Sequence, residues 1–510
     1  MNRVTQGLAK LALGAGAGAA LAACTLGPDF SRPAPPASGG YAAHAVPPAG
    51  AAQGVIYGGD VADSWYQLFH SEALNGLVRD ALANNPDLEA ARHGLLAAQY
   101  ELQAVSGTAL PQINASGGIN RTHINGSFLY APVNTLTTTA NQYSIGPTLA
   151  YKLDVFGGVR RSIEAQGAAT ANVRDQALNT YVTLVDQVVI TAFDYAATQA
   201  QIEVTQSLLN EFQAQFDLTQ ALENAGKITR SDTLQAQTQL ESTRATLPGL
   251  EQQRDVYRNA LAQLSGRTPD EFSMPVLSLK DFALPAQLPL SLPSTLVQQR
   301  PDILAAEDNL HQASAQIGVA QAARLPSLNL SAQYSQQATK LNELFTQPGG
   351  IWSFGFDVTQ PLFDGGTLKA RAEEAKERYQ QSQASYRSTV IGAFVEVANA
   401  LAALQHDADS YASHTRALDA AASSRDLALA QYRSGKFNEL QVLTVEQQYQ
   451  NAALTQVQAD AQRFTDTAAL FRALGGGWWN AAKDPSSLPS AANDVPTRTA
   501  AAAAVAANAP

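Results

Sequence analysis

The sequence predicts a mainly α-helical chain with a β-barrel, in which long antiparallel helical hairpins are joined to four membrane-spanning strands. Three observations lead to this prediction. The chain contains two copies of one unit, separated by about 210 residues. Each copy has a helical pattern roughly 65 residues long. Before that pattern, each copy has segments in which apolar and polar residues alternate, as they do in barrel strands.

The N-terminal residues have the layout of a secretory signal peptide. Arg3 and Lys10 precede an apolar stretch at 11–21, which is too short to span a bilayer because spanning takes roughly 20 apolar residues. Leu21-Ala22-Ala23-Cys24 then resembles the bacterial lipobox, in which cleavage precedes a cysteine that is acylated. We expect a signal peptide at 1–23 and a covalent lipid on Cys24, the only cysteine. The alternative is an ordinary signal peptide cut at an Ala-x-Ala site beside an incidental cysteine.

The composition argues against nucleic acid and against a membrane-spanning helix. Removing residues 1–23 takes away two basic and no acidic residues, so the formal net charge moves from −11 to −13. Nucleic acid is an unfavourable partner for such a chain, since phosphate binding needs a clustered basic face. After the signal peptide no apolar run reaches transmembrane length, so a membrane must be crossed by strands.

The sequence offers no motif for catalysis, a metal or a cofactor. It lacks an HExxH pair, a phosphate-binding loop and a recognisable pairing of nucleophile and base. His406, Asp407, Asp409 and His414 form a loose set, but their spacing along a helix fixes no third ligand. We therefore expect no enzyme and no metal site, and no cofactor beyond the lipid on Cys24.

Four pairs of segments define the duplication. In the first copy they read NNPDLEAA, ALPQINAS, FGGVRR and ENAGKITRSDTLQAQ, and in the second QRPDILAAE, RLPSLNLS, DGGTLKAR and YRSGKFNELQVLTVEQ. We place the first copy at 61–275 and the second at 276–475. They lie between an extended lipidated segment at 24–60 and a flexible Ala-rich tail at 476–510.

Each copy begins with helices and continues into a β-hairpin, expected at 111–154 and 326–363. The helical stretches Leu88–Gly107 and Ile303–Ala323 end near a Leu-Pro pair, where proline disfavours helix in the preceding residue. Alternation then places these residues on one face of the strands: Tyr143, Ile145, Leu149, Tyr151, Leu153, Leu328, Leu330, Tyr334, Trp352, Phe354, Phe356 and Val358. Such strands are typical of membrane barrels, although a half-buried soluble sheet has the same period.

The strand count constrains the assembly. Two hairpins give four strands, whereas single-chain outer-membrane barrels start at about eight. An open sheet edge cannot face lipid, because its backbone groups would be unsatisfied. The barrel must therefore be shared between chains, with eight strands from two copies or twelve from three.

A long helical hairpin follows each β-hairpin, at 158–265 and 366–474. At about 1.5 Å per residue, the first helix of each hairpin is about 100 Å long. Each first helix ends at a glycine-containing turn, at Gly226 or Gly435. Apolar residues with 4-3 spacing predict a packed core along the hairpins: Leu178, Val182, Val185, Val189, Ala192, Ala196, Val390, Ala393, Val397, Ala400 and Leu404.

These features together resemble the TolC/OprM class of outer-membrane efflux proteins, nearest its lipidated, NodT-like branch. The resemblance rests on CTLGPDFSRP, SWYQLFHSEALNGLVRDALANNPDL, DVFGG with LFDGG, and GKITRSDTLQAQTQLESTRATLP. It implies a homotrimer that shares a twelve-stranded barrel in outer-membrane lipid and extends helices into the periplasm. It also implies a passive exit duct for drugs or other small toxic compounds, driven through a periplasmic adaptor by an inner-membrane transporter of the RND type.

In that class the helix-turn-helix tips contact the adaptor and close the periplasmic aperture. The resemblance assigns adaptor contact to Gly226, Lys227, Gly435 and Lys436. It assigns the aperture to Asp232, Tyr432, Leu440, Gln441 and Thr444. Both glycines also suit a simpler role as helix C-caps.

One departure from the class concerns the charge of the aperture. Relatives commonly place aspartates one or two turns after the second tip glycine, and a carboxylate ring favours cations. Here the stretch reads Leu440-Gln441-Val442-Leu443-Thr444 and is uncharged. We expect a tip held by packing and hydrogen bonds, with weak cation selectivity and weak divalent block, unless Glu439 or Glu446 faces the pore.

Arginines and lysines after the two Gly-Gly bends have two interpretations. Arg160, Arg161, Lys369 and Arg371 either reach phospholipid headgroups or form a solvated helix face.

Three other functions compete with a gated efflux duct. A structural envelope lipoprotein would explain the lipid and the long helices but not the alternating strands. A constitutively open diffusion pore and the exit duct of a type I protein secretion system would both explain the strands.

Overall fold

The structure of the chain is a computed structural model that describes residues 25–34, 40–41, 53–124, 138–346 and 348–480. The predicted signal peptide, Cys24 and the predicted tail beyond residue 480 lie outside the described residues. The start of that tail takes part in the fold as a 3-10 turn, η5 (Trp478–Asn480). There Trp478 donates a hydrogen bond to the Gln299 carbonyl and Trp479 donates one to Asp60, both at 2.8 Å.

Two compact units make up the chain, and each contains segments of both sequence repeats. The first unit comprises residues up to 33, 96–173 and 306–386, and the second comprises 34–95, 174–305 and 387 onward. The sequence repeats are therefore not the compact units of the fold.

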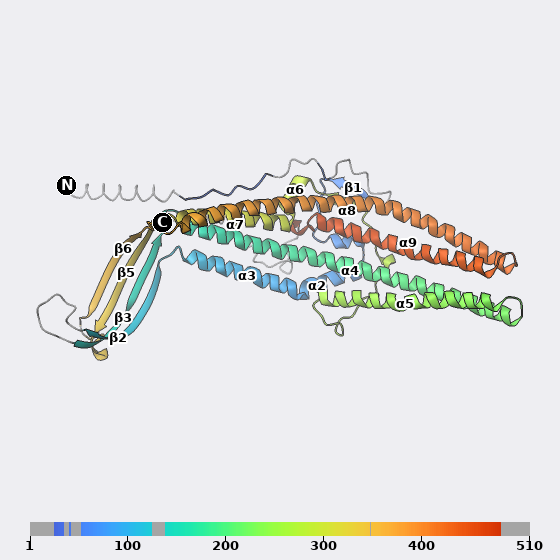
Figure 1. The fold of residues 1–510 in the computed structure, drawn as a ribbon, viewed down its shortest axis with the longest axis horizontal. Helices are drawn as coiled ribbons and strands as arrows, with labels where there is room; N and C mark the ends of the chain where they lie inside the picture. The colour runs from blue at the N-terminus through green and yellow to red at the C-terminus, as the bar shows by residue number, and fades with distance from the viewer. Residues whose placement is uncertain (1–24, 35–39, 42–52, 125–137, 347, 481–510) are drawn as a thin grey trace. The chain divides into compact units, whose positions relative to one another are not determined.

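The first unit contains a four-stranded antiparallel sheet with the order β2-β3-β5-β6 (Figure 1). Its strands are β2 (Gln112–Ile124), β3 (Thr138–Leu153), β5 (Ser327–Ala338) and β6 (Gly350–Thr359). The register aligns the apolar positions, since Phe354 pairs with Ala332, Ala332 with Leu149, and Leu149 with Ile113. One face of the sheet is therefore apolar and the other polar. In the single chain the apolar face is open, and Trp352 is 76% exposed.

In both bends that lead from strand to helix, an aspartate accepts hydrogen bonds from backbone amides at the start of the helix. Asp154 accepts backbone hydrogen bonds from Val159 and Arg160 at 2.8 and 2.9 Å. Asp364 accepts them from Leu368 and Gly366, likewise at 2.8 and 2.9 Å. These backbone donors hold the pKa of Asp364 below its usual value. Each carboxylate thus caps the positive end of a long helix, although Asp154 lies three residues before its Gly-Gly pair and Asp364 lies directly before its own.

Long helices follow both bends and have equal lengths in the two copies. They are α4 (Gly158–Asn224) and α8 (Thr367–Arg433), each of 67 residues, followed by α5 (Arg230–Leu264) and α9 (Glu439–Ala473), each of 35. The residues predicted to form the packed core by their 4-3 spacing are buried, among them Val189 and Val397. Among the described residues, α8 alone is long and apolar enough to cross a membrane by composition. About a third of this apolar window is buried inside the single chain, at 33%.

Shorter elements complete the fold. They are β1 (Gly54–Tyr57), η1 (Trp65–Phe69), α2 (Glu72–Asn84), α3 (Pro86–Gly107), η3 (Leu279–Asp281), β4 (Gln287–Leu290), α6 (Pro293–Gln299), α7 (Pro301–Ala322) and η4 (Leu341–Glu343). β1 and β4 pair in parallel.

An aromatic core lies in the second unit. Trp65 stacks on Phe471 with ring centroids 5.1 Å apart, and Phe69 meets Phe193 edge-on at 4.8 Å. All four rings are buried. They join η1 to α4 and α9, so a short N-terminal segment packs onto helices that are more than a hundred residues away in the sequence.

In the first unit, residues 25–33 form an N-terminal strap that is fastened by Arg161. The Arg161 guanidinium is 4% exposed and donates to the Leu26 carbonyl at 3.0 Å and to Asp29 at 2.7 Å. Further along the strap, Phe30 stacks on His311 at 4.3 Å, and Arg32 pairs with Glu307 at 2.7 Å. The interpretation of Arg161 as a headgroup contact or solvated residue is therefore wrong, because its charge is satisfied inside the unit. Arg160 pairs with Asp154, while Lys369 and Arg371 are exposed.

Candidate functional site

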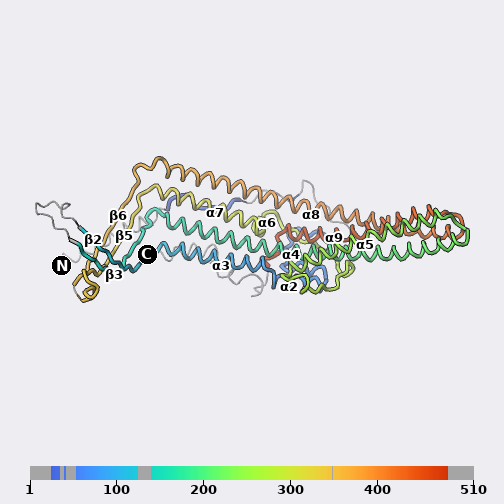
Figure 2. The backbone as a smooth tube through the Cα atoms, turned by 60° about the horizontal axis from the view of Figure 1, so that its bottom comes forward, coloured from blue at the N-terminus to red at the C-terminus, as the bar shows by residue number. Residues whose placement is uncertain are grey.

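Both tip turns end a long helix in the same way, and both lie at the same end of the second unit (Figures 1 and 2). In the first turn the Lys227 N–H donates to the Leu222 carbonyl, and the Gly226 N–H donates to the Glu223 carbonyl. In the second turn the Lys436 N–H donates to the Gln431 carbonyl, and the Gly435 N–H donates to the Tyr432 carbonyl. This is a Schellman motif, whose C′ residue takes a left-handed conformation. Gly226 and Gly435 have φ values of +68° and +76°. The glycines therefore serve as C-caps, and the lysines after them are exposed.

The second helix of each tip starts with a capping box. Thr229 and Asp232 form it before α5, and Asn438 and Gln441 form it before α9. The Thr229 N–H donates to Asp232 at 2.9 Å, and the Asn438 N–H donates to the Gln441 side chain at 3.0 Å. Two residues predicted to lie at the aperture, Asp232 and Gln441, thus occupy equivalent positions that shape the turns.

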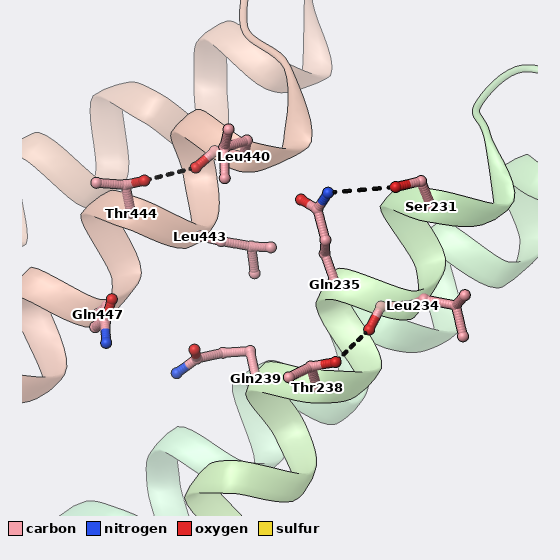
Figure 3. Close-up of a pocket in the computed structure, with 9 residues that line it drawn as sticks. All are labelled: Ser231, Leu234, Gln235, Thr238, Gln239, Leu440, Leu443, Thr444 and Gln447. Atoms are coloured by element: carbon pink, nitrogen blue, oxygen red, sulfur yellow. Dashed lines mark hydrogen bonds between the residues drawn. The ribbon is translucent and has the colours of Figure 1, made fainter.

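A groove of about 390 Å³ runs between α5 and α9 next to the turns (Figure 3). Its lining is uncharged: Ser231, Leu234, Gln235, Thr238 and Gln239 from α5, and Leu440, Leu443, Thr444 and Gln447 from α9. The side chains of Gln235 and Leu443 point into the space between the helices. The structure therefore brings the predicted aperture residues Leu440 and Thr444 together, and it adds residues of α5 to them.

Glu439 does not face this groove but lies inside the helix packing. Its side chain is 3% exposed, and Gln215 of α4 donates to both carboxylate oxygens at 3.0 Å. Burial raises the pKa of Glu439, and the hydrogen bonds from Gln215 act in the opposite direction. Burial also raises the pKa of Tyr432, and the neighbouring Glu439 raises it further. The predicted aperture residue Tyr432 therefore contacts the buried glutamate at the base of the second turn.

Glu446 lies two helical turns further along α9 and is also buried, at 6% exposure. Within the described chain its Oε2 atom has no hydrogen-bond partner. Arg425 of α8, whose charge lowers the pKa of Glu446, is held by Glu211 at 3.2 Å and Asp426 at 3.1 Å and lies 4.0 Å over the Tyr449 ring. Burial raises the pKa of Glu446 to about 7, and Glu439 and Glu211 add to the rise.

Comparison with known proteins shows the family. The model of the family described as "Outer membrane efflux protein" matches residues 77–267 and 292–476. The chain belongs to the outer membrane efflux protein family.

Relatives and solved structures match this efflux protein along most of its length. TtgC of Pseudomonas putida, named a probable efflux pump outer membrane protein, is 31% identical over 468 residues, which cover 90% of this chain and 94% of TtgC. SilC of Salmonella typhimurium, named a probable outer membrane lipoprotein, is 30% identical over 414 residues, covering 81% and 88%. The structure of the outer-membrane channel OprN superimposes with a TM-score of 0.82 at 27% identity, covering 89% of this chain and all of that one.

The predicted family, fold class, location and role are thereby confirmed. The protein is an outer-membrane channel of an efflux pump, and its fold is that of trimeric channels with an α-barrel and a β-barrel. The family is one of channels rather than enzymes.

The tip residues were predictable from the sequence, but the groups that hold them were not. Gln215 was not among the predicted residues, and Glu439 and Glu446 were expected only as possible pore charges. A signal was present, because Glu439, Val442, Glu446, Gln450 and Ala453 follow the spacing of a buried stripe and are all buried. Two glutamates at core positions would have indicated buried carboxyls. The partner on α4, Gln215, could not be found in this way, since it is 224 residues away from Glu439 in the sequence.

Proposed function

We propose that this efflux protein is the passive exit duct of a tripartite pump, which opens at its tips when a periplasmic adaptor and an RND-type inner-membrane transporter engage it. The exported compounds are drugs or other small toxic molecules. The similarity to TtgC, an efflux pump component by name, supports this proposal. Three chains contribute four strands each to a twelve-stranded barrel, which is supported by the aligned apolar face of the sheet.

The observation that best supports a gated tip is the pair of equivalent turns beside one uncharged groove. In the trimer, Leu440 and Thr444 line the aperture with Tyr432 beside them, while Asp232 and Gln441 fix the two turns. The exposed ends Gly226-Lys227 and Gly435-Lys436 contact the adaptor.

The chain is also anchored by lipid on Cys24, which the lipoprotein name of SilC supports. Because the barrel already holds the assembled trimer, the lipid acts in sorting and assembly more than in anchoring. Cys24→Ser behind a cleavable non-lipoprotein signal should leave functional trimers in the outer membrane. Complete loss of assembled trimers would contradict this division of roles.

The adaptor contact is tested by cross-linking in cells. A photo-reactive residue at Lys227 or Lys436 should capture one periplasmic protein, and the same residue at the exposed Lys376 on α8 is the control. Capture of the adaptor of a type I secretion system would replace the RND assignment. A large, steady conductance of the purified trimer without partners would indicate an open diffusion pore.

The assignment of the aperture is tested by adding a carboxylate at residue 444, where the class commonly has acidic residues nearby. Thr444→Asp should create a ring of carboxylates, so that the channel becomes cation-selective and is blocked by divalent cations added at the tip side. Ser242→Asp adds the same charge on the exposed face of α5, outside the groove, and should change neither property. If Thr444→Asp conducts like the parent channel, residue 444 does not line the aperture.

A further inference from the structure

Buried carboxyls of α9 meet residues of two other helices, α4 and α8, at the tips. Glu439 and Glu446 lie on the inner stripe of α9, at 3% and 6% exposure, rather than on the groove side occupied by Leu440 and Thr444. Gln215 ties Glu439 to α4, and Tyr432 contacts it from α8. The position of α9, and with it the groove lining, therefore depends on the contacts of Glu439 and on the charge state of both buried carboxyls.

The surroundings of the two carboxyls contain more negative than positive charge. The titratable groups that face them are Glu211 from α4, Asp232 from α5, Arg425 and Tyr432 from α8, and Tyr449 from α9. Among the described residues, Arg425 is the cation that opposes Glu446, and it is already bound to Glu211 and Asp426. Ionised Glu439 and Glu446 would therefore repel each other and Glu211 in a place with little water. Neutral carboxyls remove that repulsion and keep the hydrogen bond from Gln215.

We propose that Glu439 and Glu446 are positioning residues which hold α9 against α4 and α8 while they carry protons, so that loss of these protons loosens α9 and favours the open aperture. The inference rests on the proposed role of the tips as the aperture. It assigns regulation by protons to a channel whose constriction has no carboxylate ring.

The direction of the effect follows from the raised pKa values. A carboxyl that binds its proton more tightly in the closed tip stabilises that tip at low pH, and the stabilisation is lost as pH rises towards about 7 for Glu446. Each unit by which the pKa differs between closed and open tips corresponds to a tenfold change in the equilibrium between them. Since the bulk periplasm follows external pH, acid surroundings would keep the idle duct closed.

Bilayer conductance of the purified, full-length trimer at pH 5.5 and pH 8.5 tests the proposal. We expect the time spent conducting to rise about tenfold at the higher pH, on the basis of one unit of pKa difference. Glu446→Gln and Glu439→Gln keep the shape but not the charge, and each should reduce this rise. Asp419→Asn is the control, because it removes a carboxyl from the exposed face of α8, away from the buried pair, and it should leave the rise unchanged.

Several outcomes would overturn the proposal. An equal conducting time at both pH values, or an undiminished rise in both glutamine variants, would exclude the glutamates as the sensor. If the variants fail to form trimers, spin labels at Lys227→Cys and Lys436→Cys in the otherwise unchanged chain decide the question. The distances between tips should broaden at pH 8.5, and identical distributions would refute the loosening of α9.

A wrong assignment of the aperture and a wrong assignment of the proton regulation give different experimental results. A bifunctional thiol cross-linker that joins Ser231→Cys to Leu440→Cys across the groove should lock the tips and abolish conduction at every pH if the tips are the aperture. Conduction that survives the lock contradicts the aperture itself. Conduction that is abolished by the lock but insensitive to pH contradicts only the proton regulation.

Discussion

At Gly226 and Gly435 the chain takes a left-handed conformation that other residues adopt only at a cost. An added Cβ would meet open space at both positions, so the backbone angle alone determines the effect of substitution. Gly226→Ala or Gly435→Ala should destabilise the local turn by about 1 kcal/mol. Hydrogen exchange at the amides of the turn should therefore become about fivefold faster, since RT is about 0.6 kcal/mol.

Gly249 provides the matched control for these substitutions. It lies inside α5, also has open space around an added Cβ, and does not have a positive φ. Gly249→Ala should slow exchange or leave it unchanged, because alanine favours a helix interior. Faster exchange in Gly249→Ala than in the turn variants would contradict the account.

Arg161 should decide whether the N-terminal strap stays docked. Arg161→Ala removes hydrogen bonds to Leu26, Gly27 and Asp29, and bonds to a charged donor contribute about 1.5–3 kcal/mol each. Exchange at residues 25–33, measured by mass spectrometry, should rise at least about tenfold. Lys369→Ala at the corresponding position of the second repeat is exposed and should leave the strap protected. If exchange at the strap is unchanged in Arg161→Ala, the stacking of Phe30 on His311 and the Arg32–Glu307 pair are enough to keep the strap docked.

Local chemistry at single residues was partly predictable from the sequence. The C-cap glycines follow from the spacing of Gly226 and Gly435 after long helical patterns, because a left-handed residue there needs glycine. The burial of Arg161 could not be predicted, since the strap that satisfies its charge is more than a hundred residues away. The interior position of Glu439 was readable from the stripe on α9, but Gln215 was not.

At the scale of elements, the α8–α9 hairpin contains a carboxyl pair that should make its stability depend on pH. The pKa of Asp407 is raised to about 7, first by burial and then by the neighbouring Asp466 of α9, while Arg463 acts in the opposite direction. The folded hairpin therefore binds a proton that the unfolded chain releases near pH 4. Stability should be highest below that pH and fall as pH rises to about 7.

Thermal unfolding of the detergent-solubilised trimer at pH 5, 6, 7 and 8 measures this effect. The melting temperature should fall across the series, and Asp407→Asn should make the decline shallower, because the amide has no proton to lose. His406→Asn next to it is exposed and serves as the control. A decline of equal slope in Asp407→Asn would assign the pH dependence to other groups, such as Asp186, whose pKa is raised to about 6.

The lengths of the elements were predictable, whereas their grouping was not. Periodicity, the Leu-Pro pairs and the tip glycines predicted two hairpins of equal construction, and the helices of 67 and 35 residues recur in both copies. The compact units nevertheless combine segments of both copies. Contacts such as that of Trp65 with Phe471 produce this grouping, and no local pattern encodes which distant helices pack together.

At the scale of the whole molecule, the proposed trimer meets membrane lipid through the apolar face of the sheet, and this assignment can be tested. Phe354 lies in a row with Ala332, Leu149 and Ile113 across all four strands, and it is 66% exposed in the single chain. Ser353 is its neighbour on β6 and points to the opposite face. The two positions therefore separate contact with lipid from contact with the lumen.

Arginine at these two positions should have opposite consequences. Phe354→Arg places a charge against hydrocarbon and should cost about 2–4 kcal/mol per chain near the bilayer midplane, so that heat-stable trimers in outer-membrane fractions decrease strongly. Ser353→Arg faces water in the lumen and should leave the amount of trimer unchanged while altering single-channel conductance. Quantification of trimers on unheated gels, together with bilayer recordings of the trimers that form, measures both effects. Loss of trimers in Ser353→Arg with normal amounts in Phe354→Arg would mean that the faces are reversed and that the polar side of the sheet meets the lipid.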